Sequence, residues 1–437
     1  MMKLLVGAAM VVAFAAQSAT AQFLFFRVEG QPLTPGGPSV QSTTDLYQPA
    51  LSADGQTLAF SASSGNNLVA GLTTNGAQVL VFSLATGAIE LASTSPAGQP
   101  SAPSSTNEHV AVSADGRYIA FETMSTTYTG GVAGIHLVRV DRQTHQHSRL
   151  NVDVANQLPA GTIAKLGGIS ADGRFVAFTS NAANLTPGGA SNNTYSVFVR
   201  DVSAGVTQRV DVSSSGTPGN GGSHSYRPTL SADGRSVAFA STASNLVGGS
   251  LSGSQRIYLR DLQAGVTTRI SIGPGGSDLS GASNPAISPN GQWVVFGSGS
   301  GGSSATQLWV RGLASPAAVA VPAASGMSIC AHGRIADSGF VIAQCSHANA
   351  NLPSQAYVWQ LTNPSAPPAL VSGSDPANTI PGNGIAGAGV TTSVNNGVFA
   401  FDADANNLVA IDTNNASDVF VYLDPSLLDL IFRDGFE

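Results

Sequence analysis

The sequence is poor in charged residues, and lysine is nearly missing. Of 437 residues, 18 are Lys or Arg and 25 are Asp or Glu, so only 10% are charged, against about 25% in average soluble domains. The net charge is −7, and Lys3 and Lys165 are the two lysines. An acidic chain with so few cations is not suited to the phosphates of nucleic acid.

Long hydrophobic runs are missing after residue 21, so we expect no membrane span in the mature chain. The N-terminus itself has the pattern of a secretory signal: Lys3, an apolar stretch from Leu4 to Ala16, and the small residues Ala19 and Ala21. We predict a signal peptide over 1–21 and export to the periplasm or the extracellular space. The alternative is an uncleaved N-terminal anchor.

Cysteine occurs twice, at Cys330 and Cys345, each in or beside an apolar run. An exported protein meets an oxidising compartment, where such a pair can be bridged across a hairpin. We therefore predict a disulfide between them, with two buried free thiols as the alternative.

Glycine (50 residues) and an internal repeat are what the sequence has in excess. The segment Leu51–Phe60, which contains Ser-Ala-Asp-Gly and ends in Ala-Phe, recurs with small changes along the chain. Anchoring the sixth, divergent copy on Asn351 and Leu352 puts Cys345 in its phenylalanine position. That position then falls at residues 60, 121, 178, 239, 296, 345 and 401. The period is therefore near 57, and seven copies account for most of the chain.

Each copy contains four strand-like pieces, the first two joined by a tight Asp-Gly turn. A four-stranded antiparallel unit repeated seven times predicts an all-β fold, a seven-bladed β-propeller. The last copy lacks its fourth piece, and residues 23–29 resemble one. We predict that they complete the seventh blade and close the ring. The propeller would span 22–424, followed by a C-terminal tail over 425–437.

The segments Ile169–Phe178 and Leu230–Phe239 resemble the TolB-type, WD-like propeller repeat, and the resemblance covers nearly the whole mature chain. It implies the fold more than the function, because such propellers serve as scaffolds, ligand binders and companion domains of peptidases. A fuller pattern, Asn-Leu-Val followed by Asp-x-Asn and Asp-Val-Phe-Val-Tyr, occurs in the last copy at 407–409, 412–414 and 418–422. It is similar to the pattern of a bacterial exported subgroup. The end of the chain, Ile431–Glu437, resembles a short tail found on exported proteins of Gram-negative bacteria, for which a sorting tag is one hypothesis.

Long connections follow the second and fourth pieces of each copy, and in an antiparallel unit these connections share one face. Long loops on a rigid scaffold are the usual carriers of binding. The candidate ligand-binding residues on them are Tyr47, Tyr128, Tyr195, His224 and Tyr226. The alternative is that these side chains only pack their own loops.

One segment carries oxygen ligands at close spacing: Asp412, Asn414 and Asp418 could hold Ca²⁺, a cation that prefers six to eight oxygens. The other copies do not keep this pattern, and the alternative is an Asx-rich turn that leads into a strand. No other cofactor is indicated. The GxSxG motif of serine hydrolases, the HExxH motif of zinc peptidases and the P-loop do not occur. Gly382–Gly387 fits the dinucleotide-binding pattern GxGxxG, but it leads into a predicted strand and not into a helix, so we interpret it as a loop between blades.

These observations favour an exported, monomeric, non-enzymatic propeller that binds a protein or polysaccharide partner through its long-loop face. Two alternatives stay open. The protein could be a hydrolase or lyase with its site at the central channel, or a structural component of the cell envelope.

Overall fold

The computed structural model describes the chain in segments. They are residues 2–6, 9–13, 24–28, 45–63, 68–69, 76–102, 109–159, 161–187, 195–222, 227–249, 253–299, 307–322, 326–347, 349, 351–361, 368–373, 381–393, 397–408 and 416–423. This part of the chain is all-β, apart from one helical turn, α1 (Thr126–Thr129), and one 3-10 turn, η1 (Pro274–Gly276).

Antiparallel four-stranded units follow one another along the chain. The first three are β4 (Leu46–Leu51), β5 (Thr57–Ala62), β6 (Gln78–Ser83) and β7 (Ile89–Leu91); β8 (Val110–Val112), β9 (Tyr118–Thr123), β10 (Gly134–Asp141) and β11 (His147–Arg149); and β12 (Thr162–Ile169), β13 (Phe175–Ser180), β14 (Ser196–Asp201) and β15 (Val206–Arg209). A short parallel pairing of β10 with β12 joins the last two units into one eight-stranded sheet.

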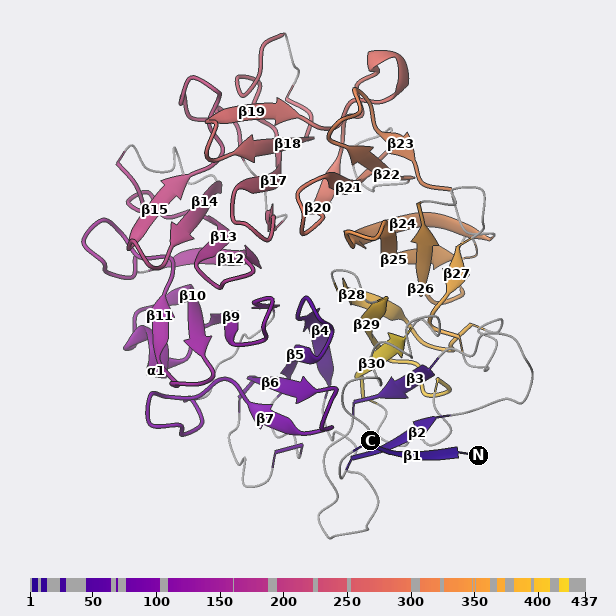
Figure 1. Ribbon diagram of the computed structural model, residues 1–437. Helices are drawn as coiled ribbons and strands as arrows, with labels where there is room; N and C mark the ends of the chain where they lie inside the picture. Colours follow the sequence, from indigo (N-terminus) through magenta and orange to yellow (C-terminus); the bar gives the residue numbers. More distant parts are fainter. Residues whose placement is uncertain are drawn as a thin grey trace.

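The following units repeat the same order. They are β16 (Thr229–Leu230), β17 (Ser236–Ser241), β18 (Arg256–Asp261) and β19 (Val266–Arg269); β20 (Ser283–Ile287), β21 (Trp293–Ser298), β22 (Gln307–Gly312) and β23 (Val319–Ala320); and β24 (Met327–Ile335), β25 (Phe340–His347), β26 (Gln355–Gln360) and β27 (Ala369–Leu370). The units stand around a common middle, which β4, β12, β20 and β28 border (Figure 1).

One further sheet joins the two ends of the chain. It consists of β28 (Ala386–Thr392), β29 (Val398–Ala403), β30 (Asp418–Leu423) and, from the N-terminal side, β3 (Leu24–Arg27). Leu24 stands opposite Leu423 in an antiparallel register, and the amide of Val28 donates to the carbonyl of Val419 at 2.9 Å. The N-terminal segment thus forms the outer strand of a sheet whose other strands lie near residue 400 (Figure 1).

The predicted signal segment forms a two-stranded sheet, β1 (Met2–Val6) with β2 (Ala9–Ala13), that takes no part in the four-stranded units. Among the described residues, no helix is long and apolar enough to cross a membrane.

The repeated Ser-Ala-Asp-Gly segment is a turn that side chains hold in place. In the first unit the hydroxyl of Ser52 donates to Asp54 (2.6 Å) and accepts from the amide of Thr57 (2.9 Å). Gly55 has a φ of 72°, in the left-handed region that glycine adopts without strain. The same hydroxyl–carboxylate contact recurs at 2.6 Å in the next three copies, between Ser113 and Asp115, Ser170 and Asp172, and Ser231 and Asp233.

These turns also bind one another across neighbouring units. The amide of Ala53 donates to the carbonyl of Ala114 at 3.1 Å. The series continues from Ala114 to Ala171, from Ala171 to Ala232 and from Ala232 to Pro289 at 2.7–2.9 Å. The repeat is therefore conserved between these copies for a physical reason: the turns of the first five units are joined in one hydrogen-bonded series.

The second strand of each unit buries the repeated phenylalanine. Phe178 is fully buried and stacks on Phe198 of the next strand, with ring centroids 5.6 Å apart. In the sixth copy the register places Ala343 opposite Tyr357 of β26, at the position where the other units have the repeated phenylalanine. The placement of Cys345 in the phenylalanine position is therefore wrong by two residues, because this copy lacks the Ser-Ala-Asp-Gly turn that aligns the others.

Cys345 instead stands directly opposite Cys330 on β24, and the two form a disulfide bond with an S–S distance of 2.07 Å. Both cysteines are buried. The bond joins the innermost strand of this unit to its neighbour.

Candidate functional site

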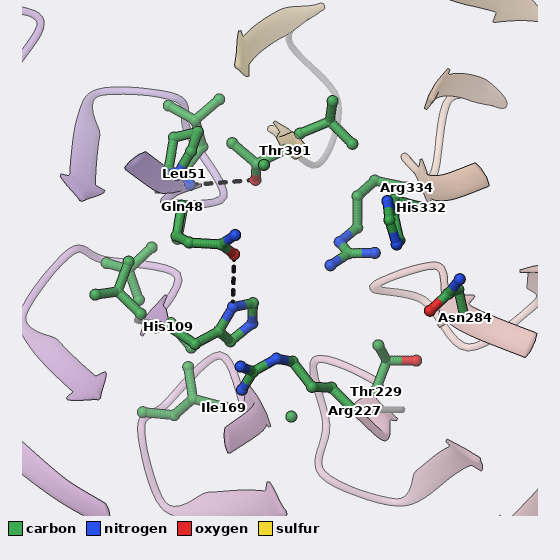
Figure 2. A pocket seen from close by; sticks show the side chains of 18 of the residues that line it. Gln48, Leu51, His109, Ile169, Arg227, Thr229, Asn284, His332, Arg334 and Thr391 are labelled. Carbon is green, nitrogen blue, oxygen red and sulfur yellow. Dashed lines mark hydrogen bonds between the residues drawn. The ribbon is translucent and has the colours of Figure 1, made fainter. Parts of the chain in front are cut away.

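A cavity of about 590 Å³ lies in the middle, where the first strands of the units meet. This volume falls within the range of roughly 300–1,000 Å³ that is usual for small-molecule sites. Its lining comes from β4, β8, β12, β20, β24 and β28 and the segment before β16 (Figure 2). The polar lining side chains are Gln48, His109, Arg227, Thr229, Asn284, His332, Arg334 and Thr391.

Most of these side chains occupy one position of the repeat. Counting back four residues from the serine of the repeated turn gives Gln48, His109, Arg227 and Asn284. In the sixth copy Ala336 takes the place of this serine, and the same count gives His332. The repeat is strongly similar elsewhere, yet at this position five of the seven copies carry polar side chains of varying type, while the third has Leu166 and the seventh Gly389. Leu166 is buried and does not line the cavity. The position therefore faces the cavity in the other six copies and supplies most of its polar side chains.

The backbone turns three of these side chains toward the cavity at β-bulges. Gln48, Asn284 and His332 have φ values of 56°, 50° and 55°, and the strand register shifts at each of them. A left-handed conformation costs a non-glycine residue roughly 1–2 kcal/mol. Bulges re-aim side chains next to functional sites, and strain of this kind persists where a function uses it.

The bulge at Gln48 is held by a buried carboxylate on the neighbouring unit. Asp402 on β29, 4% exposed, accepts hydrogen bonds from the amides of Gln48 (3.1 Å) and Gly389 (2.8 Å). Burial raises the pKa of Asp402 to about 6, although these two hydrogen bonds act in the opposite direction. Both oxygens of this carboxylate therefore accept hydrogen bonds from backbone amides, and the group is not a free acid in the cavity.

We predict a pH dependence of stability that Asp402 alone explains. Its folded-state pKa (about 6) lies above its ordinary value of 3.8, so between about pH 4 and 6 the folded state holds a proton that the unfolded state has lost. The free energy of unfolding of the wild type, minus that of Asp402→Asn, should therefore decrease as the pH rises through this window. Denaturant unfolding of both proteins at several pH values measures the difference.

The comparison of the wild type with Asp402→Asn also removes the contribution of His109 to the pH dependence of stability, which has the opposite sign. Burial, together with the charges of Arg227 and Arg334, lowers the pKa of His109 well below 6.5. The stability associated with His109 is therefore present above pH 6.5 and is lost as the pH falls. It occurs in both proteins and cancels. A difference that stays flat, or rises with pH, would contradict the assignment to Asp402.

A second buried carboxylate occupies the same repeat position as Asp402, directly after the phenylalanine. Glu122 on β9 is fully buried, accepts from the amide of Leu166 at 2.8 Å and forms an ion pair with Arg227. Lys165 lies 3.7 Å from its other oxygen. Arg227 also donates to the carbonyl of Leu166 at 2.9 Å. This network holds the guanidinium of Arg227 at the cavity wall and joins three neighbouring units.

His109 is oriented by Gln48. The Nδ1 atom of His109 lies 2.9 Å from Oε1 of Gln48 (Figure 2). Because an amide oxygen only accepts, Nδ1 carries the proton. The ring is neutral, since its pKa is depressed, so Nε2 is left as an acceptor.

The predicted loop residues lie elsewhere. Tyr128 on α1 is fully buried and its hydroxyl donates to the carbonyl of Thr94 at 3.1 Å, so it packs the interior. Tyr195 is half-buried just before β14, and Tyr47 is half-buried directly before Gln48. None of the three lines the cavity. His224 and Tyr226 lie outside the described residues, although Tyr226 directly precedes Arg227.

The predicted calcium segment is only partly described. Asp418 is buried at the start of β30, while Asp412 and Asn414 lie outside the described residues. Within the described part, no group of three or more His, Cys, Asp or Glu side chains could hold a metal ion. The calcium site stays a prediction.

Comparison with solved structures identifies the fold. An oligogalacturonate lyase in complex with manganese is 14% identical, with a TM-score of 0.53 over 95% of this chain and 96% of that one. The β-propeller domain of the Trilobed protease from Pyrococcus furiosus is 11% identical, with a TM-score of 0.51 over 86% of this chain and 93% of that one. The chain is a β-propeller.

The matches also include TolB, whose propeller repeat the sequence resembles. A TolB structure from Acinetobacter baumannii is 18% identical, with a TM-score of 0.36; the match covers 67% of this propeller and only 58% of that chain. No protein-family model and no curated protein matches the sequence. At these identities the likeness concerns the fold alone, so the function of the propeller must be argued from its own cavity.

Proposed function

We propose that this protein is an exported, non-enzymatic propeller of seven blades, closed by β3, which binds a protein or polymer partner and takes part of it into the central cavity. The observation that carries the proposal is the variable polar position, at which Gln48, His109, Arg227, Asn284 and His332 face one cavity. Except for His332, which lies within β24, these residues lie at or near the starts of the innermost strands, next to the connections between blades that would form the long-loop face. The buried disulfide is the kind of bond that persists in the oxidising compartments outside the cytoplasm.

The two carboxylates buried beside the cavity, Glu122 and Asp402, favour binding over catalysis. Glu122 and Asp402 are occupied by backbone amides, and Glu122 also by Arg227, so neither is placed as a general acid. One observation favours the alternative, a hydrolase or lyase: Nε2 of neutral His109 could accept a proton from a bound molecule.

Affinity capture with a pocket variant tests the proposal. The chain from residue 22 is immobilised and exposed to the native secreted fraction, in parallel with Gln48→Ala and with Gln143→Ala, an exposed control in the short turn between β10 and β11, away from the cavity and the long-loop face. We expect one partner to be retained by the wild type and by Gln143→Ala, but much more weakly by Gln48→Ala.

The fate of the partner separates the alternatives. A partner that is recovered with unchanged mass supports a binding protein. A partner that is cleaved by the wild type and left intact by His109→Ala would replace the proposal with the hydrolase or lyase. Equal retention by both glutamine variants would show that the cavity takes no part.

A further inference from the structure

Arg334 enters the cavity with no counter-charge from the described residues. Its side chain is half-buried, and its Nη1 donates a hydrogen bond to the carbonyl of Gly333, on its own strand, at 3.2 Å. No ion pair among the described residues includes it. By contrast, Arg227 is paired with Glu122, and the exposed Arg174 and Arg235 are paired with Asp201 and Asp261.

The two cavity guanidinium groups repel each other. Burial, together with the charge of Arg227, lowers the pKa of Arg334 to about 10. Figure 2 shows both groups directed toward the middle of the cavity. Arg227, Arg334 and Lys165 carry three positive charges against the two carboxylates of Glu122 and Asp402, so this region is at least one unit positive in a chain of net charge −7. A bound anion would relieve the repulsion.

The remaining polar groups suit hydroxyl groups. Nε2 of His109 accepts, the amide NH2 of Gln48 donates, and Asn284 and His332 on the facing wall offer both functions. The hydroxyls of Thr229 and Thr391 are already occupied by the amides of Ile287 and Leu51 on neighbouring strands.

We infer that the cavity binds a carboxylate that carries hydroxyl groups, as a sugar acid does, with the carboxylate between Arg334 and Arg227 and the hydroxyls toward His109, Gln48 and Asn284. This inference rests on the proposed function, because it names what part of the partner the cavity takes. A carboxylate suits the site better than a phosphate. The small excess of positive charge matches one negative charge, and the described wall consists of strands, without the helix N-terminus or glycine-rich loop that phosphate sites use.

Calorimetric titration with glucuronate and with glucose tests the inference, since the two sugars differ in the carboxylate. We expect glucuronate to bind and glucose not to. Arg334→Gln should weaken glucuronate binding by about 10- to 100-fold, the effect of removing a charge-assisted hydrogen bond. Arg235→Gln should leave the affinity unchanged. Arg235 is exposed in the turn between β16 and β17, in the same unit as Arg227, and it does not line the cavity.

The melting temperature of the free protein gives a second, independent result. Because no described residue neutralises the charge of Arg334 in the free cavity, Arg334→Gln should melt at or above the wild-type temperature. A marked decrease would show that Arg334 stabilises the fold and would overturn its assignment to a ligand.

Other outcomes are equally decisive. Tighter binding of glucose 6-phosphate than of glucuronate would overturn the carboxylate class. No glucuronate binding, together with partner capture that still depends on Gln48, would refute this inference and leave the proposed function standing. A polyuronate that binds more tightly than the monomer would support the inference and identify the source as an acidic polysaccharide, whereas equal affinities would support it with a free sugar acid as the source.

Discussion

A chain that starts at residue 29 should be less stable, by about 3 kcal/mol or more, than one that starts at residue 22. The shorter chain lacks β3, which pairs with β30, and it lacks Val28, which is 1% exposed in a cluster with Val419 and Val421. Burial of one such valine contributes roughly 1.5–3 kcal/mol, and the paired strand adds to it. Denaturant unfolding of the two chains measures the loss.

The chain that starts at residue 22 is the matched control, because it lacks β1 and β2 but keeps β3. The shorter chain should also self-associate, since its unpaired β30 becomes an open sheet edge. Size-exclusion chromatography detects this. Equal stability and equal size of the two chains would refute closure of the ring by the N-terminal strand.

Replacement of both cysteines by alanine should lower the free energy of unfolding by about 3 kcal/mol, the expected effect of a bond that closes a loop of about 15 residues. The disulfide joins β24 to β25. Because β24 also carries His332 and Arg334, we expect the double variant to bind its cavity ligand more weakly as well.

A reductant provides the control for this prediction. Dithiothreitol should shift the unfolding curve of the wild type toward that of the double variant and should leave the double variant unchanged. A wild type that is insensitive to reductant under conditions in which both thiols react with a labelling reagent would contradict the assigned role of the bond.

Much of the architecture could be predicted because it depends on interactions between residues close in the chain, and these residues recur in each copy of the repeat. The serine, aspartate and glycine of each turn bond within a few residues, as Ser52, Asp54 and Thr57 show. The alternation of the third piece and the buried phenylalanine are equally local. The sixth copy was misaligned where this local signal is lost, and its register came only from the pairing of Ala343 with Tyr357.

The candidate site could be predicted only in part. The search for long loops led to Tyr47, Tyr128 and Tyr195, none of which lines the cavity, whereas Gln48, Arg227 and the other lining residues belong to the inner strands or directly precede them. A usable signal was present: the position four residues before the repeated serine is polar and variable in five copies, and Glu122 and Asp402 share another variable position after the phenylalanine.

The sequence by itself determined the all-β repeat, the turns that join its strands and the approximate period, because these depend on contacts between residues close in the chain. Only the tertiary structure decided which polar side chains meet. His109 and Gln48 lie 61 positions apart, and Gln48 and Asp402 lie 354 apart. Such groups become neighbours only when the sheets stand around a common middle and bulges with positive φ turn the side chains inward. Neither the sign of φ at a non-glycine residue nor the meeting of distant strands can be read from a one-dimensional pattern.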